Sequence, residues 1–470
     1  MLWTLLFFVA AWAELPGPMI EVELHRNGLA SSQTAHLPGD DFAMLRHRDG
    51  CEFSVERYGP DLTERWSVPL AYEPRMKKLG NLLYGGRTPG CLVKMYTPVW
   101  GSLIALSTAG SEFRVFAVQE KGVVVDRISP KDGTTQREDL LVAGGNHHLR
   151  LHEGTGRLVV ITHHAGDTPT EARFYGPDLK QLGQAAWSES SDQYWRQYSV
   201  DAKGLLYVLE HLEDGTWHVH QVKPDGTRKT LSWYEVNPRE GVPAWGHDDS
   251  GQVYVAVRSG MKAAAKDELV VTALDFKNQR FRWQKVAGMS WLFPEVDDKL
   301  LRRTDQFFVL PQKNGDVVVI SQFFAPWGMQ YTGAVPYEGL WREPADDKGG
   351  WLIGNLRIVT LDKEGQARWA SDIPVNQKSE DYTLQVGGGF QMRPSGTTLR
   401  LAWREFSDAN SIQVKDLDLT TGGVTPVASF PFRFANWGRD LTLLQEDQMV
   451  ILTQEGLQVH TGQLRAIPLK

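Results

Sequence analysis

The chain has 470 residues, with 50 Lys and Arg against 57 Asp and Glu, so its formal net charge is −7. Charged residues make up 23% and hydrophobic residues 41%, a balance typical of globular proteins that excludes disorder, collagen and coiled coil. No block of Lys or Arg could neutralise a phosphate backbone or hold an anionic membrane surface, so we predict no nucleic-acid partner and no membrane-surface partner.

The N-terminal segment is apolar from Leu2 to Ala13 and ends in Ala11-Trp12-Ala13, ahead of Glu14. This pattern predicts a secretory signal peptide, residues 1–13, cut after Ala13. The segment is too short to span a bilayer, which takes about 20 apolar residues, and no later stretch approaches that length. We therefore expect a secreted or periplasmic protein, the alternative being an N-terminal strand buried in the fold.

A short apolar run preceded by a turn recurs along the chain. Seven copies begin at residues 101, 156, 204, 251, 315, 396 and 447, and a weaker eighth, DDFAMLR, begins at residue 40. The mean interval, (447 − 101)/6 or about 58 residues, is typical of propellers and solenoids. The runs are rich in Val, Ile and Leu, as expected of strands covered on both faces.

Each run is followed by an alternating strand, a turn rich in Gly, Asp or Pro, and another strand, and a further strand usually precedes it. No helical period persists along the chain. We predict an all-β protein, a β-propeller of about eight four-stranded antiparallel blades, with seven as the alternative count. It forms one domain, residues 40–470, after a lead-in strand and loop at 14–39. A two-sheet sandwich, the competing fold, would not explain the period.

Two phrases, TALDFKNQRFRWQKV (272–286) and IVTLDKEGQARWASDIP (358–374), resemble the pyrroloquinoline-quinone-type (PQQ-like) repeat of quinoprotein propellers. The resemblance covers nearly the whole chain in architecture and implies eight blades, with a Trp that docks between neighbouring blades. This Trp recurs at Trp66, Trp187, Trp233, Trp283 and Trp369, and Ile128, Phe430 and Ile467 take its place in the other three blades.

The resemblance implies a fold rather than a chemistry. Quinoprotein dehydrogenases place a vicinal Cys-Cys pair over the quinone, and this chain has no such pair, so we predict no cofactor. In character the chain is most similar to the non-enzymatic scaffold propellers of outer-membrane assembly. Those are lipoproteins, however, and residue 14 here is Glu rather than the acceptor Cys.

Strand order places residues on one of two rims. With strands a to d numbered outward from the axis, the blade-to-blade connections and the b–c turns share one rim, the connection rim, while the a–b and c–d turns share the other, the turn rim. Cys51 and Cys91 fall on the connection rim of blades 1 and 2. We predict a disulfide between them, with two buried free thiols as the alternative.

The connection rim also collects histidines and arginines. We expect His147 and His148 to begin strand a of blade 3, His163 and His164 to end its strand b, His211 to end strand b of blade 4 and His247 to begin strand a of blade 5. Arg196, Glu210, Asp248 and Arg258 come from equivalent places. Such imidazoles could bind a ligand or transfer protons. Their spacing fits no metal motif, so we predict no metal site, and the alternative is a scattered set bonded to loops.

The longest insertion, 323–355, lies between strands b and c of blade 6 on the same rim. Its aromatic residues, which include Trp327, Tyr331 and Trp341, can close a pocket or anchor a partner. The alternative is that they cap the propeller's own core. A loop of this length is more often functional than incidental.

We therefore expect an exported, monomeric propeller that binds another envelope or extracellular protein, or a small ligand, through the connection rim. The competing function is a propeller hydrolase or lyase that acts on a small or carbohydrate-like substrate, with rim His and Asp residues as acid and base. The sequence does not decide between them. A deep axial pocket lined by His and carboxylates would favour the enzyme, and a flat aromatic rim would favour the binding protein.

Overall fold

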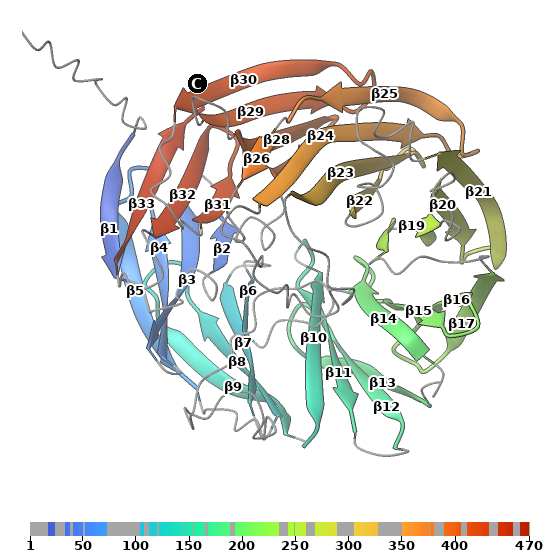
Figure 1. The fold of residues 1–470 in the computed structure, drawn as a ribbon. Helices are drawn as coiled ribbons and strands as arrows, with labels where there is room; N and C mark the ends of the chain where they lie inside the picture. Colours follow the sequence, from blue (N-terminus) through green and yellow to red (C-terminus); the bar gives the residue numbers. More distant parts are fainter. Residues whose placement is uncertain are drawn as a thin grey trace, which may run out of the picture.

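The computed structural model describes residues 17–23, 33–37, 41–49, 52–72, 104–107, 112–119, 122–142, 144–152, 154–164, 168–188, 193–234, 243–248, 250–259, 268–288, 305–327, 350–375, 377–379, 390–405, 411–431, 440–454 and 461–469. These residues form 33 strands and no helix, and the strands assemble into eight antiparallel sheets. Figure 1 shows the sheets as blades around a ring, in chain order from blue to red. The predicted all-β propeller of eight four-stranded blades is confirmed.

In blades 1 to 4 the strands a to d follow one another along the chain. Blade 1 consists of β2 (Gln33–His36), β3 (Phe42–Asp49), β4 (Glu52–Tyr58) and β5 (Glu64–Ala71). Blade 2 consists of β6 (Ile104–Ser107), β7 (Phe113–Gln119), β8 (Gly122–Ile128) and β9 (Thr135–Val142). Blade 3 consists of β10 (Asn146–His152), β11 (Arg157–His163), β12 (Thr170–Tyr175) and β13 (Gln181–Trp187). Blade 4 consists of β14 (Gln193–Val200), β15 (Leu206–Leu212), β16 (Thr216–Val222) and β17 (Arg228–Tyr234).

Blades 5 to 7 repeat this order, with one additional strand in blade 6. Blade 5 consists of β18 (Ala244–His247), β19 (Gln252–Ser259), β20 (Glu268–Asp275) and β21 (Arg280–Gly288). Blade 6 consists of β22 (Asp305–Pro311), β23 (Val317–Trp327), β24 (Gly350–Leu361), β25 (Ala367–Ile373) and the short β26 (Gln377–Ser379). Blade 7 consists of β27 (Phe390–Ser395), β28 (Thr398–Glu405), β29 (Ser411–Asp418) and β30 (Val424–Pro431).

Blade 8 is completed by the N-terminal part of the chain. Its strands a to c are β31 (Asp440–Leu444), β32 (Gln448–Gln454) and β33 (Thr461–Pro468), and its strand d is β1 (Met19–Glu23), which pairs with β33. In Figure 1 the blue β1 lies beside the red β33, so the ring closes by hydrogen bonds between the two ends of the chain. The segment 14–39, expected as a lead-in strand and loop, thus contributes two propeller strands, β1 and β2.

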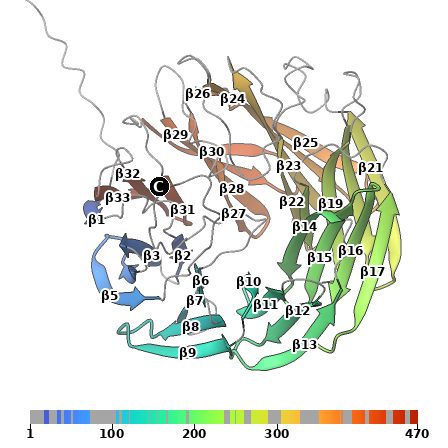
Figure 2. The same cartoon turned by 60° about the horizontal axis from the view of Figure 1, so that its bottom comes forward.

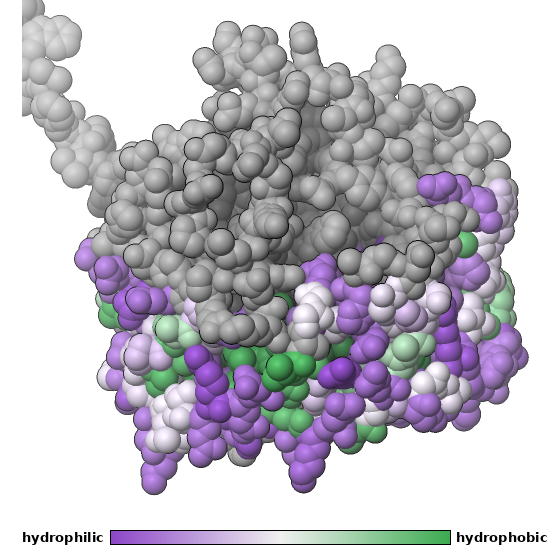
Figure 3. Space-filling view, turned by 90° about the horizontal axis from the view of Figure 1, so that it is seen from below, coloured by the Kyte–Doolittle hydropathy of each residue, from purple (hydrophilic) through white to green (hydrophobic). Residues whose placement is uncertain are grey.

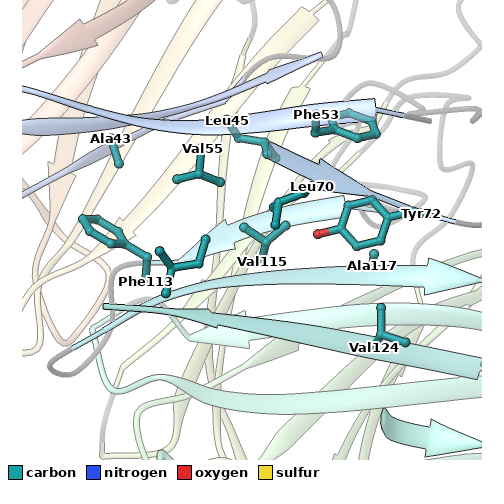
Figure 4. Close-up of a cluster of buried hydrophobic side chains, with 11 residues drawn as sticks. Ala43, Leu45, Phe53, Val55, Leu70, Tyr72, Phe113, Val115, Ala117 and Val124 are labelled. Carbon is teal, nitrogen blue, oxygen red and sulfur yellow. The ribbon is translucent and has the colours of Figure 1, made fainter. Parts of the chain in front are cut away.

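The core is divided among the junctions between blades. Strands b and c are buried almost throughout, as in β7 and β15, whereas outer strands such as β25 alternate exposed and buried residues. The buried apolar residues form eight clusters, and each cluster joins two neighbouring blades. Figure 4 shows one of them, with Leu45 and Val55 of blade 1 pointing toward Val115 and Ala117 of blade 2. Every blade therefore depends on its neighbours to cover its apolar faces.

Three junctions are held by a tryptophan of strand d, near the turn rim. Each indole Nε1–H donates to a carbonyl in the c–d turn of the next blade: Trp66 to Pro130 (2.9 Å), Trp283 to Lys363 (2.9 Å) and Trp369 to Leu419 (3.2 Å). In the last case the turn glycine, Gly422, has a φ of 76° and lies so close to the indole that a Cβ would come 2.6 Å from it. These contacts are the inter-blade docking that the PQQ-like resemblance implies.

The other predicted docking residues lie elsewhere. Trp187 is the last residue of β13 and Trp233 is near the end of β17, so both are at the connection-rim end of strand d. Ile128 and Ile467 belong to the c strands β8 and β33, and Phe430 is near the end of β30. All five nevertheless belong to, or pack against, clusters that join two neighbouring blades, so they lie between blades as expected, although not at the position of the three docking indoles.

Three further junctions use the reverse arrangement, in which an apolar residue of the c–d turn inserts toward the preceding blade. Leu62 of blade 1, Leu179 of blade 3 and Phe276 of blade 5 are all buried in the clusters shared with blades 8, 2 and 4. Leu62 and Leu179 adopt left-handed backbone conformations, with φ of 63° and 64°. Both sit in the same sequence, Gly-Pro-Asp-Leu, which closes on itself through a hydrogen bond from the leucine N–H to the glycine carbonyl.

Among the residues that the structure describes, blade 6 is the blade whose sheet has a fifth strand. Beyond the residues that pair with β22, strands β23 and β24 continue for four more pairs, from Phe324↔Ile353 to Trp327↔Gly350, and β26 pairs with β24 there. We call this three-stranded extension (324–327, 350–353 and 377–379) the arm. It leaves the blade where strand b ends, on the connection rim, and β24 and β26 rise above the ring in Figure 2.

Two predictions fall outside the described residues: the signal peptide at 1–13 and the Cys51–Cys91 disulfide. In the part of the chain that the structure describes, no helix has the length and apolarity needed to cross a membrane.

Candidate functional site

The candidate site lies at the junction between blades 3 and 4, here called the seam. The polarity of its buried residues changes from one rim to the other. Toward the turn rim the seam is apolar, with Val159, Phe174 and Val208 among its buried residues. Toward the connection rim it becomes polar from Tyr198 onward, because the alternate residues of β14 and β15 that face blade 3 are then Arg196 and Glu210. Buried polar side chains of this kind are stable only when they satisfy one another.

Glu210 is the centre of this polar half. Its carboxylate accepts from Arg196 Nε at 2.7 Å and from His220 Nε2 at 2.9 Å, and all three side chains are at most 8% exposed. Burial raises the pKa of the Glu210 carboxyl, but the hydrogen bond from His220 and the charge of Arg196 lower it by more, so the group is ionised at neutral pH. Arg196 Nη1 also reaches the Tyr198 hydroxyl, at 3.4 Å.

Two histidines lie side by side on the same face of β16. The rings of His218 and His220 are parallel within 9°, with centroids 5.6 Å apart. His220 Nδ1 lies 2.8 Å from the Thr230 hydroxyl and His218 Nδ1 lies 2.7 Å from the Ser232 hydroxyl, both on β17. Because a carboxylate can only accept, Nε2 of His220 carries the proton and Nδ1 accepts from Thr230 in the neutral ring. Burial lowers the pKa of His220, which favours this neutral form.

Blade 3 completes the seam with two more imidazoles. His163 lies between two hydroxyls, with Nδ1 3.2 Å from Thr170 and Nε2 3.3 Å from Tyr198. The ring of His148 meets His163 edge-on at 5.0 Å. Arg150 donates from Nε to the backbone carbonyl of Tyr198 at 2.9 Å and lies over its ring. The seam therefore joins residues of both blades into one continuous polar contact.

The structure thus brings together two members of the predicted set, His163 and Arg196, through Tyr198. His147 lies on the opposite face of β10, where its Nδ1 is 2.9 Å from the Thr162 hydroxyl and its ring is 2% exposed. His164 directly follows β11. These histidines are close in sequence but do not converge on one point.

His211 faces the next junction, between blades 4 and 5. Its ring stacks on Trp217 at 4.2 Å, and Trp217 stacks on Trp233 at 5.9 Å, so three aromatic rings cross the blade. Burial lowers the pKa of the His211 imidazole. A neutral, stacked ring of this kind is a packing element of blade 4.

His247 lies on the other rim, so its predicted placement was wrong. It is the last residue of β18 and pairs with Val253, next to the a–b turn, where its Nε2 lies 2.8 Å from the Ser199 hydroxyl and its ring stacks on Tyr207. Strand β18 has only four residues, so the sequence pattern did not determine where the strand begins and ends. Asp248 is likewise in that turn and accepts from the backbone amide of Gln252.

The remaining predicted residues are described only in part. Arg258 is near the end of β19 and Trp327 is the last residue of β23, both at the connection rim, and their side chains lie outside the described residues. Tyr331 and Trp341 lie outside them entirely. Across the ranges that the structure describes, no group of three or more His, Cys, Asp or Glu side chains is placed to hold a metal ion.

Sequence reasoning overlooked the contribution of β16. The run Trp217-His218-Val219-His220 alternates in the way that places both histidines on one face and both apolar residues on the other. That signal was available. What the sequence did not show is that Glu210, a neighbour only through strand pairing, stands beside them.

The outer wall of the ring offers no competing surface. The exposed large apolar residues each belong to the outer strand of a different blade: Met19, Val142, Leu182, Tyr234, Phe281 and Val424. Figure 3 shows one side of the wall as mostly hydrophilic, with a hydrophobic group near its middle and smaller hydrophobic spots toward its edges. Isolated apolar side chains are normal on a protein surface and do not mark an interface.

No protein-family model matches the chain, and no curated protein matches it in sequence. Solved structures resemble it in fold at low sequence identity. The WD40 domain of SCAP from fission yeast is 10% identical with a TM-score of 0.43, and the match covers 93% of this chain and 94% of that one. A mutant of the apocarotenoid oxygenase of Synechocystis is 12% identical (TM-score 0.41, 90% and 94% covered), and a prolyl endopeptidase is 10% identical (TM-score 0.42, 92% and 55% covered).

Proposed function

We propose that this protein is an exported binding protein, and that it recognises another envelope or extracellular protein through the connection rim at the arm of blade 6. The observation that carries the proposal is the arm itself. Strands β23, β24 and β26 continue as a hydrogen-bonded sheet beyond the blade. An extension of this kind contributes nothing to closing the ring, since the blade is already complete without it.

The sequence of the insertion supports the same proposal. The stretch 328–349 that joins the two strands of the arm includes Met329, Tyr331, Tyr337 and Trp341. Aromatic residues and Met are enriched at the centres of protein interfaces, where they supply most of the binding energy. The outer wall, with its dispersed apolar residues, supports no comparable surface.

The test replaces residues 328–349 with Asn-Gly, so that Trp327 and Gly350 remain joined by a short turn. We expect the same thermal unfolding midpoint as the wild type, because the blades are untouched, together with loss of the protein partner that is cross-linked to the wild-type chain in its native envelope fraction. The matched control changes Lys363 and Glu364, in the turn of the same blade on the turn rim, to Ser and should retain that partner. Recovery of the same partner by the shortened chain would refute the proposal.

Export is tested separately. The mature protein, purified from its native source, should begin at Glu14, which intact mass measurement detects. A mature chain that still carries residues 1–13 would contradict the proposed processing.

One observation favours the competing hydrolase. Ser199 Oγ and His247 Nε2 are 2.8 Å apart on the turn rim, the geometry of a nucleophile and its base. The carboxylates that flank the pair in sequence, Asp201 and Asp248, accept from the backbone amides of their own turns. Labelling of Ser199 by a fluorophosphonate probe, abolished by His247→Gln, would establish the hydrolase, whereas an unlabelled Ser199 would leave binding as the function.

A further inference from the structure

The polar half of the seam between blades 3 and 4 concentrates ionisable groups that respond to acid. Four of the 13 histidines of the chain line the connection-rim half of this seam: His148 and His163 from blade 3, and His218 and His220 from blade 4. Glu210 is the carboxylate that His220 contacts there. A seam built in this way changes its charge in the pH range where imidazoles titrate.

Charged and titratable groups of both blades line the polar half of the seam in which His220 lies. Arg196 and Tyr198 come from β14, Glu210 from β15, His218 from β16 and Arg228 from β17, while blade 3 contributes His148, Arg150 and His163. Among these groups Glu210 is the carboxylate, and its two oxygens already accept from Arg196 and His220. A proton added to His220 is attracted by Glu210, but its burial and the repulsion of Arg228 outweigh that attraction.

We propose that this seam is an acid-sensitive joint, in which protonation of His220 loosens the contact between blades 3 and 4. The parallel stacking of His218 on His220, at 5.6 Å, strengthens the effect, because a proton on either ring repels a proton on the other. The apolar half of the same seam, which includes Val159 and Val208, holds the blades in register.

The direction of the effect follows from the pKa of His220. Burial lowers it below 6.5 in the closed seam, so the opened seam binds the proton more tightly. Stability of the seam is full above about pH 6.5 and is lost as the pH falls toward the lowered pKa. The lowered pKa of Glu210 acts in the same direction at still lower pH, since that contribution is lost as the carboxyl protonates. Each proton taken up can raise the opening equilibrium by up to about tenfold per pH unit.

Hydrogen exchange of the whole protein tests this joint. Exchange rates of β10–β17 amides, corrected for the intrinsic pH dependence of exchange, are compared between pH 7.5 and pH 5.0 with those of β22–β25 and β27–β30 as an internal reference. We expect the protection of the blade 3 and blade 4 amides to fall by about three- to tenfold relative to the reference, as one to two protons bind.

Three variants complete the test. His220→Gln keeps a donor toward Glu210 but cannot take up a proton, so its exchange ratio should change much less with pH than that of the wild type, and His218→Gln should weaken the response by removing the ring stacked on His220. His152→Gln, at the turn between β10 and β11, is the matched control and should respond like the wild type. The proposal is overturned if the wild-type seam tracks the reference junctions down to pH 5.0, or if His220→Gln or, should that variant not fold, His218→Gln responds as strongly as the wild type.

Discussion

At Leu179 we expect substitution by glycine to destabilise the protein less than substitution by alanine, the reverse of the usual order. Its side chain is 7% exposed in the cluster between blades 2 and 3, yet its backbone φ of 64° is a conformation that costs a non-glycine residue about 1–2 kcal/mol. The Gly-Pro-Asp-Leu turn therefore stores strain that the burial of one leucine must offset. Removing the side chain separates these two contributions.

Leu179→Ala loses the buried side chain and keeps the strain, so it should destabilise the protein by about 3 kcal/mol. Leu179→Gly loses the same side chain but relieves the strain, and after the greater flexibility of glycine in the unfolded chain is deducted it should be about 0.5–1 kcal/mol more stable than the alanine variant. The measurement is urea-induced unfolding followed by tryptophan fluorescence, at constant pH and salt.

The control is Leu158, which belongs to the same cluster, is 1% exposed and lies in β11 with ordinary strand geometry. At this position glycine should be worse than alanine by about 0.5–1 kcal/mol, the usual order. The reasoning predicts a sign change between the two sites. If glycine is the worse substitution at both, the left-handed turn contributes no strain and the account of this junction is refuted.

Three other outcomes are expected. Trp369→Ala should lower stability by about 3 kcal/mol in urea unfolding, because it removes a docking indole and its hydrogen bond to the c–d turn of blade 7; an unchanged midpoint would contradict that role. Glu56→Gln should cost about 3–5 kcal/mol, because it leaves the buried guanidinium of Arg46 without its counter-charge, and a thermal midpoint equal to that of the wild type would refute this. Cys51 and Cys91 should resist alkylation in denaturant until a reductant is added; two thiols modified without it would exclude the predicted disulfide.

The fold was largely predictable because a propeller repeats itself. Strands b and c of every blade must be apolar on both faces to fill two junctions, which produces runs such as that of β15, and a strand d exposed on one face must alternate, as β25 does. Eight repetitions of such a pattern are visible without any alignment. The strand that completes blade 8 could not be found in this way, because β1 and β33 lie at opposite ends of the chain and only their pairing joins them.

The site was less predictable, and for a physical reason. His147 and His163 lie at the same end of the paired strands β10 and β11. Successive residues of a strand face opposite junctions, however, and His147 pairs with Thr162, the residue before His163, so the two histidines face different seams. A register shift of one residue turns every side chain of a strand toward the opposite junction. The rim position of His247 likewise depends on where the four-residue β18 begins. The rim on which a residue lies can be estimated from sequence spacing, whereas the junction that its side chain faces depends on the register of its strand.

The different ways of joining blades explain why the repeat motif is so degenerate. A tryptophan on strand d and a leucine or phenylalanine in the next c–d turn fill the same kind of gap from opposite sides, so a blade that lacks one can use the other. Selection for a filled junction therefore does not preserve a single residue at a single position.

The junction between blades 3 and 4 uses neither arrangement. There the backbone of β13 lies directly against the c–d turn of blade 4, so close that a Cβ on Gly183 would come 1.9 Å from the Pro224 carbonyl oxygen. At this junction neither a docking indole nor an apolar residue of the c–d turn holds the blades together, and its cohesion depends more on the rest of the seam. That remainder is the apolar cluster together with the polar contacts of Glu210, His220 and His163. Because the polar part contains the buried His220, we expect a change of pH to act on the ring at this junction.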